Sequence, residues 1–150
     1  MIQPFLDEYY MKRALEEAQI AFEEDEIPVG AVIALGNKII ARAHNQIERL
    51  NDPTAHAEMI AITAATGLLG AKYLVDCRLY VTVEPCVMCA GAIGWAQMAE
   101  VIYGANDEKR GFRRFAPAAL HPKTTIRGGV MEAECAEMMR FFFQNKRLKH

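Results

Sequence analysis

The chain has 150 residues, of which 52% are apolar and 24% are charged, and its formal net charge at pH 7 is −2. A chain of this length and composition is typical of one globular domain, which we expect to span residues 1–150. No apolar run approaches the length of a membrane span, and the acidic N-terminal segment is unlike a secretory signal, so we expect a cytoplasmic protein without a membrane anchor.

The first half of the chain alternates between helical and extended patterns. Apolar residues recur at helical spacing between 7 and 24 and predict a first helix there. Two apolar runs at 29–35 and 38–44 flank a Gly-Asn pair, which indicates a β-hairpin. A polar loop follows and ends in Thr54, which we expect to cap a helix over 56–66.

The second half of the chain continues the alternation of strands and helices. The elements expected there are a strand at 78–83, a helix from Pro85 to about 95, strands at 99–105 and 124–128, and a last helix at 132–146. The stretch between 106 and 124 is expected to be irregular. Because strands and helices alternate after an initial hairpin, the pattern predicts a mixed sheet with helices on both faces.

Charge is distributed unevenly along the sequence. Residues 1–30 contain eight acidic and two basic side chains, whereas 109–127 contain six basic and no acidic ones, and 140–150 contain four more basic ones. If the two basic segments fold together, they form a surface for a polyanion. The alternative is that they are two separate solvated surfaces, which is the common case for charged segments.

Two of the predicted helices begin with residues that can bind a metal. His56 and Glu58 open the first, and Cys86 and Cys89 are three apart, so they share one face of the second. His56, Cys86 and Cys89 would leave one position of a tetrahedral zinc ion for water, as in catalytic sites. Zinc lowers the pKa of its water to about 7, and Glu58 is suited to take that water's proton.

Other interpretations of the cysteine pair are a structural zinc site and a redox couple. A closed structural site needs a fourth ligand, for which Cys77 and Cys135 are the candidates, but we expect both to be buried small apolar residues. A redox couple would leave His56 and Glu58 without a role. The sequence therefore favours a catalytic metal.

The pattern H-A-E … P-C-V-M-C resembles the signature of the zinc-dependent nucleoside and nucleobase deaminases, His-x-Glu followed by Pro-Cys-x-x-Cys. Over most of its length the chain is most similar to bacterial tRNA adenosine deaminases, in E-x-P-V-G-A-V, L-Y-V-T-x-E-P-C-x-M-C-A-G-A, G-A-x-D-x-K-x-G and the ECAEMMRFFFQNKR helix. The resemblance implies a three-layer α/β/α sandwich of the α/β class with a mixed five-stranded sheet. It also implies one Zn²⁺ per subunit, a homodimer, and hydrolysis of adenosine to inosine at the wobble position of a tRNA anticodon stem-loop.

The resemblance also assigns substrate contacts to particular positions. Around the flipped nucleoside it implies Pro28 and Val29 as a wall, Asn45 as a hydrogen-bonding partner, the backbone N–H groups of Ala57 and Cys86, and His121. Along the RNA it implies Phe142, Phe143, Lys146 and Arg147, which fits single-stranded recognition by stacking and cations. By residue type alone, a Phe run on a helix is more often core, and His121 is also explained as an ordinary loop histidine.

The chain departs from the tRNA deaminase pattern at two places. Where many members have a small Gly-Ala-Ala-Gly-Ser turn, this chain has GFRRF at 111–115. The segment GAIGWA, with Trp95, resembles guanine deaminases. A deaminase of a free base or nucleoside, of the guanine or cytosine type, is therefore the alternative function. A zinc-stabilised binding module without catalysis is a further alternative, against which the presence of Glu58 argues.

Overall fold

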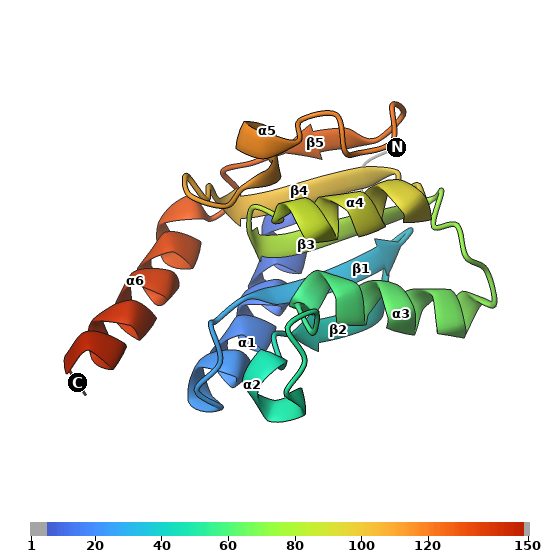
Figure 1. Ribbon diagram of the computed structural model, residues 1–150. Coiled ribbons are helices and arrows are strands. Elements are labelled where there is room, and N and C mark those ends of the chain that lie inside the picture. Colours follow the sequence, from blue (N-terminus) through green and yellow to red (C-terminus); the bar gives the residue numbers. More distant parts are fainter. Residues whose placement is uncertain (1–5, 149–150) are drawn as a thin grey trace.

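A computed structural model of the protein describes residues 6–148 and contains one mixed five-stranded sheet (Figure 1). The strands are β1 (Gly30–Leu35), β2 (Lys38–His44), β3 (Cys77–Val83), β4 (Glu100–Ala105) and β5 (Thr125–Arg127), in the order β2-β1-β3-β4-β5. The pairs β1–β2 and β1–β3 are antiparallel, whereas β3–β4 and β4–β5 are parallel. The predicted mixed sheet is confirmed.

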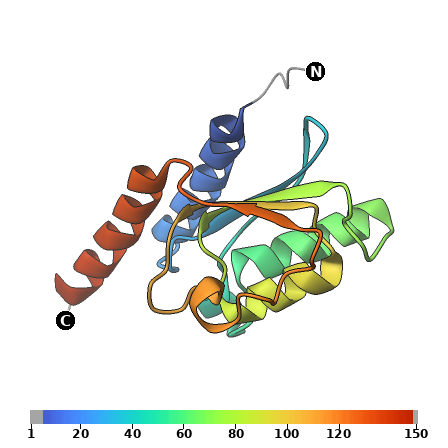
Figure 2. The ribbon, with the colours of Figure 1, turned by 90° about the horizontal axis from the view of Figure 1, so that it is seen from above.

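Helices cover both faces of the sheet (Figures 1 and 2). They are α1 (Asp7–Glu23), α2 (Ile47–Leu50), α3 (Ala57–Leu69), α4 (Val87–Ala96), α5 (Phe112–Phe115) and α6 (Glu132–Leu148). The helices α3 and α4 pack on one face and α1 and α6 on the other, which confirms the three-layer α/β/α sandwich. No helix within residues 6–148 is long and apolar enough to cross a membrane.

Strand β1 lies at the centre of both hydrophobic cores. Its side chains alternate between the two faces: Ile33 packs in the cluster under α3 and α4, and Val32 packs in the cluster under α1. Because both faces of β1 are buried, its sequence GAVIAL is apolar throughout rather than alternating.

Helix α1 approaches the backbone at the start of β1 very closely. A Cβ atom at Gly30 would overlap the carbonyl oxygen of Ala14 and would lie 2.5 Å from the amide nitrogen of Ala18. The N–H of Gly30 donates to the hydroxyl of Thr82 on β3 over 3.1 Å. Position 30 therefore has no room for a side chain, and this contact sets the distance between α1 and the sheet.

Two expectations about helix starts were wrong. Thr54 does not cap α3, because its hydroxyl and its N–H both donate to Asp52, over 2.7 and 2.8 Å. His56 occupies the N-cap position of α3, and Cys86 that of α4, so Pro85 precedes the helix instead of lying in its first turn. The segment expected to be a plain loop after β2 also contains the short helix α2.

The close contact at position 30 generates a prediction about stability. Gly30→Ala is expected to lower the free energy of unfolding by about 2 kcal/mol or more, because inserting a methyl group into a packed contact forces the helix away from the sheet. Urea denaturation followed by circular dichroism measures this change.

A matched control is Gly67→Ala. Gly67 lies in the exposed part of α3, where an added Cβ meets nothing within 4 Å. Because alanine has a higher helix propensity than glycine, this variant is expected to have a free energy of unfolding higher by about 0.5–1 kcal/mol. Equal effects of the two substitutions would contradict the proposed role of the α1–β1 contact.

Candidate metal centre and active site

The two helix starts bring the three predicted metal ligands together. His56 directly precedes α3, Cys86 directly precedes α4, and Cys89 lies in the first turn of α4. The Nδ1 atom of His56 is 3.7 Å from Sγ of Cys86 and 3.5 Å from Sγ of Cys89. One donor atom from each residue lies within 4.8 Å of the other two.

These separations fit a tetrahedral zinc ion. With zinc at about 2.3 Å from sulfur and about 2.0–2.1 Å from nitrogen, a tetrahedral angle would place the nitrogen and each sulfur about 3.6 Å apart. Cys89 is fully buried, whereas His56 and Cys86 are partly exposed, so the cluster opens towards solvent on one side. The donor set and its spacing therefore fit zinc with one position left for a ligand from solvent.

The other two cysteines lie in the cores. Cys77 and Cys135 are each 1% exposed and belong to the hydrophobic clusters on opposite faces of the sheet. This confirms the expectation that both behave as small apolar residues. Among residues 6–148, the only metal-capable His/Cys/Asp/Glu group is this three-residue cluster, so no fourth protein ligand is present to make a closed structural site.

The predicted metal ligands also shift one another's pKa values. Hydrogen bonding from Cys89, together with that from His56, lowers the pKa of Cys86 to about 4. The pKa of Cys89 is raised well above its usual range by the hydrogen bond to Cys86 and by burial. Both sulfurs must be thiolates to bind a metal ion, so metal binding would release any proton that remains on them.

Glu58 lies in the first turn of α3, next to the ligands. Its side chain is 3% exposed. Burial raises the pKa of Glu58 to about 7, and its carboxyl group forms a hydrogen bond with Cys89. A carboxyl group with this pKa can both accept and release a proton near neutral pH. The geometry therefore places a buried carboxyl group beside the predicted metal ligands.

Asn45 holds the turn that carries His56. Its Oδ1 accepts the N–H of Ala57 over 2.8 Å, and its Nδ2 donates to the carbonyl of Ile27 over 3.0 Å. The side chain is 4% exposed, and one N–H of its amide remains for a ligand. Asn45 and Ala57 thus bind each other in this structure, and their expected contacts with a nucleoside stay predictions.

The remaining expected nucleoside contacts lie in different surroundings. Pro28 and Val29 are buried and lead into β1. His121 is partly exposed, and its Nδ1 accepts the N–H of Lys123 over 3.1 Å. The substrate roles of these three residues stay predictions as well.

Two buried carboxylates were missed by sequence reasoning. Glu84, 5% exposed, accepts the N–H groups of Asp107 and Arg113 over 3.1 and 3.2 Å and pairs with the guanidinium of Arg113. Glu26, 1% exposed, accepts the N–H groups of Glu48 and Arg49 at the start of α2. Glu84 directly precedes the Pro-Cys pair, and this position was the available signal that it lies close to the candidate site.

Of the residues expected to bind RNA at the end of α6, some have buried or paired side chains and others are exposed to solvent. Phe142 is 6% exposed and packs edge-on against Phe22. Lys146 pairs with Asp25 over 2.7 Å and lies over the ring of Phe142. Phe143 is 41% exposed, and Arg147 is also exposed. Their contacts with RNA stay predictions, for which Phe143 is better exposed than Phe142.

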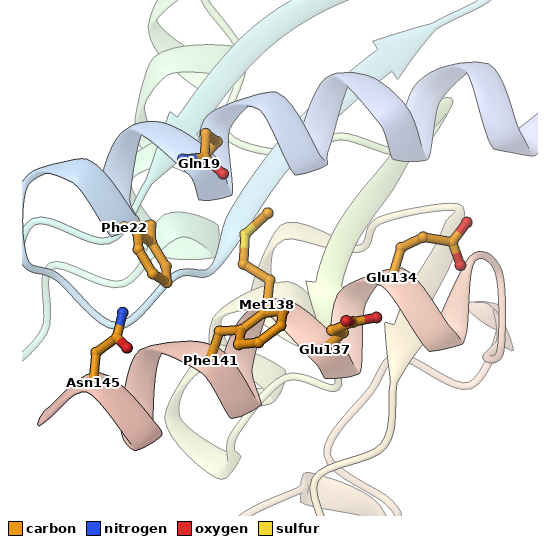
Figure 3. A pocket seen from close by; sticks show the side chains of 7 residues that line it. All are labelled: Gln19, Phe22, Glu134, Glu137, Met138, Phe141 and Asn145. Carbon is orange, nitrogen blue, oxygen red and sulfur yellow. The ribbon is translucent and has the colours of Figure 1, made fainter. Parts of the chain in front are cut away.

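A groove of about 380 Å³ lies between α1 and α6, on the opposite face of the sheet from the helices that carry the metal ligands (Figure 3). Its lining consists of Gln19, Phe22, Glu134, Glu137, Met138, Phe141 and Asn145. The two carboxylates make it unfavourable for phosphate. This groove is therefore distinct from the metal centre.

Comparisons with known proteins agree with this geometry. Residues 5–105 match the family described as the cytidine and deoxycytidylate deaminase zinc-binding region. A tRNA-specific adenosine deaminase of Agrobacterium fabrum (strain C58) is 44% identical, over 93% of this chain and 95% of that protein. A structure from work on A-to-I editing by tRNA:A34 deaminases at the wobble position of transfer RNA is 42% identical, with a TM-score of 0.82, over 87% of this chain and 98% of that one.

A second kind of deaminase is also similar. The structure of a guanine deaminase from Bacillus subtilis is 45% identical, with a TM-score of 0.65, over 68% of this chain and 66% of that one. The similarity to the tRNA-specific enzyme thus covers more of the chain.

The ligand set generates a prediction about metal content. Cys86→Ala is expected to lose most of the zinc that the purified protein carries, because two donors hold the ion far more weakly than three. Zinc is measured by mass spectrometry after dialysis. Cys77→Ala is the matched control and is expected to keep its zinc, since that thiol lies in the core. Full zinc occupancy in Cys86→Ala would refute the ligand assignment.

Proposed function

The chain belongs to the deaminase family defined by the cytidine and deoxycytidylate deaminase zinc-binding region, and from this premise we propose that it hydrolyses adenosine to inosine at the wobble position of a tRNA anticodon. The observation that carries the proposal is the meeting of two helix starts, which places a His/Cys/Cys cluster beside a buried carboxyl group. The 44% identity to a tRNA-specific adenosine deaminase indicates the substrate.

Three residues would hold the metal. His56, Cys86 and Cys89 offer one imidazole nitrogen and two sulfurs, and we propose that they bind one Zn²⁺ per subunit. Bound zinc polarises a water molecule so that it loses a proton near neutral pH. Asn45 keeps the His56 turn in place by binding the adjacent N–H of Ala57, so the imidazole is oriented before the metal arrives.

Glu58 would move the protons of the reaction. Its carboxylate takes a proton from the attacking water and delivers it to N1 of the adenine ring as C6 is attacked. The proton of the newly added hydroxyl group then passes through the same carboxyl group to the amino group, which leaves as ammonia. Water and adenosine are consumed, and inosine and ammonia are formed. Because burial raises the pKa of Glu58 to about 7, its carboxyl group is suited to both proton transfers.

The macromolecular partner in this proposal is the anticodon stem-loop. Its bases are already unpaired, so extruding the target adenosine costs at most a few kcal/mol. Phe143 and Arg147 face solvent at the end of α6, where stacking and phosphate pairing are open to them. Phe142 would support that surface from below, and Lys146 would add a second cation once it leaves Asp25.

A free-base deaminase of the guanine type is the second candidate function. It is favoured by the 45% identity to a guanine deaminase over 68% of the chain and by the GAIGWA segment of this chain, which resembles that of guanine deaminases. Such an enzyme has no use for a basic surface. A side-by-side assay of the zinc-loaded protein on a stem-loop with adenosine at the wobble position, guanine, cytosine and cytidine separates the two functions.

We also propose that the whole chain forms one deaminase domain and that it acts as a homodimer in the cytoplasm. The exposed face of α4 supports the dimer: Trp95 is 84% exposed and Val87 is 43% exposed. Large exposed apolar side chains on one helix face are typical of protein contacts. The cytoplasm is where a tRNA substrate and reduced cysteines are both found.

The proton role of Glu58 generates a prediction about turnover. Glu58→Gln is expected to keep its zinc and bind the stem-loop but to form inosine about 100- to 10,000-fold more slowly, because an amide cannot carry the protons. Inosine is measured by mass spectrometry of digested RNA. Glu48→Gln alters an exposed carboxylate at the start of α2 and is expected to retain full activity. Comparable rates in both variants would remove Glu58 from the chemistry.

The C-terminal cations generate a prediction about salt dependence. Reversing Lys146 and Arg147 to glutamate is expected to weaken stem-loop binding and to reduce the slope of log K against log salt by about one to two, since each phosphate contact contributes about 0.7–0.9. The control Lys12→Glu/Lys38→Glu makes the same change in net charge at two exposed positions elsewhere. If both double variants show the same slope, α6 makes no specific phosphate contact.

A further inference from the structure

The GFRRF segment forms a short helix at the edge of the metal centre. Gly111, just before α5, pairs with Cys86 in an isolated β-bridge, and the N–H of Phe112 donates to the carbonyl of Pro85 over 2.9 Å. Figure 1 shows α5 beside the N-terminal end of α4. The segment that departs from the small turn of related enzymes therefore begins at the turn that carries a metal ligand.

Buried contacts fix this segment in place. Phe112 is 2% exposed, and the guanidinium of Arg113 lies 3.3 Å from the buried carboxylate of Glu84. A Cβ atom at Gly111 would overlap the same carboxylate. Because one end of α5 is held by the core and by an ion pair, the rest of the segment is presented to solvent from a rigid base.

The exposed end of α5 offers an aromatic ring and a cation together. Phe115 is 58% exposed, and the guanidinium carbon of Arg114 lies 5.4 Å from the centre of its ring. The guanidinium also donates to the carbonyl of Glu108 over 2.9 Å, which directs it over the turn. Lys109 and Arg110 are exposed just before the helix. Residues 109–115 thus contain four cations and no acid.

We propose that Phe115 and Arg114 bind the nucleotide next to the target adenosine in single-stranded RNA. The Phe115 ring stacks on the base and the Arg114 guanidinium pairs with the backbone phosphate, the combination by which proteins hold single strands. The start of α5 lies against the turn that carries Cys86. With the target adenosine at the metal centre, the nucleotide next to it in the strand would therefore reach α5. This inference rests on the proposed function, and it identifies a surface that a free base would not use.

Charge argues for RNA as the occupant rather than a second copy of this chain. A symmetric contact through α5 would bring Lys109, Arg110 and Arg114 against the same three cations of the partner, which is unfavourable, whereas Arg113 is already paired with Glu84. A polyanion meets those cations with the opposite sign.

The test measures binding of a fluorescent anticodon stem-loop to the zinc-loaded protein at several salt concentrations. Phe115→Ala is expected to raise Kd by roughly five- to a hundredfold, the effect of losing one stacked base. Phe115→Trp is expected to restore binding because it keeps an aromatic face. Arg114→Ala is expected to reduce the salt slope by about 0.7, the contribution of one phosphate contact on a single strand. Zinc content is measured for every variant and is expected to stay the same.

A matched control exists at the other end of α3. Tyr73 is 45% exposed, and Nζ of Lys72 lies 5.2 Å from its ring centre, so this pair has the same chemistry away from the metal ligands. Tyr73→Ala is expected to leave Kd and slope unchanged. A stem-loop with an abasic nucleotide beside the target tests the stacking directly: it should weaken binding to the parent protein, with no further loss in Phe115→Ala.

The outcomes separate the two proposals. If the parent protein neither binds nor deaminates the stem-loop, the proposed function and this inference both fail. If the parent protein is active and Phe115→Ala binds like Tyr73→Ala, only the role of α5 is refuted. Conversion of a dimer to a monomer by Phe115→Ala, measured by sedimentation, would also refute it, since the surface would then belong to a subunit contact.

Discussion

The site depends on holding two helix starts side by side before any metal binds. His56 and Cys86 are 30 residues apart in the chain, yet their donor atoms are 3.7 Å apart. Two turns whose backbone N–H groups lack helical partners must therefore approach each other. Asn45 binds the N–H of Ala57 in the first turn, and Glu84 binds the loop that packs on the second. Each of these buried side chains forms hydrogen bonds with backbone groups, which offsets much of the cost of burying it.

The sequence predicts the parts of this arrangement that follow from local pattern. Apolar runs predict β1 and the alternating elements around it, and the spacing of the cysteines predicts a shared helix face. The ligand cluster then follows because both turns lie at the same edge of the sheet. The burial of Glu26 and Glu84 could not be predicted in this way, because the local sequence does not distinguish a buried glutamate from an exposed one. Only tertiary packing shows that each carboxylate accepts backbone N–H groups.

Residue-type preferences at helix starts did not predict where α3 and α4 begin. Thr54 is a good capping residue by type, but Asp52 takes both of its donors in a turn of its own. Pro85 fits a first helical turn, but the two ligand residues occupy the N-cap positions themselves. Each of these two helices thus starts at a proposed metal ligand, and neither N-cap side chain forms a capping hydrogen bond.

The contact between the ends of α1 and α6 has a consequence for how firmly the protein can hold a polyanion. Lys146 is already paired with Asp25, which follows the C-terminal end of α1. A phosphate group at that position would displace the aspartate, and because the ion pair is exposed, breaking it costs at most about 1 kcal/mol of the attraction. In the proposed complex with RNA, Asp25 would therefore compete with phosphate for Lys146, which would favour release of a modified strand over tight retention.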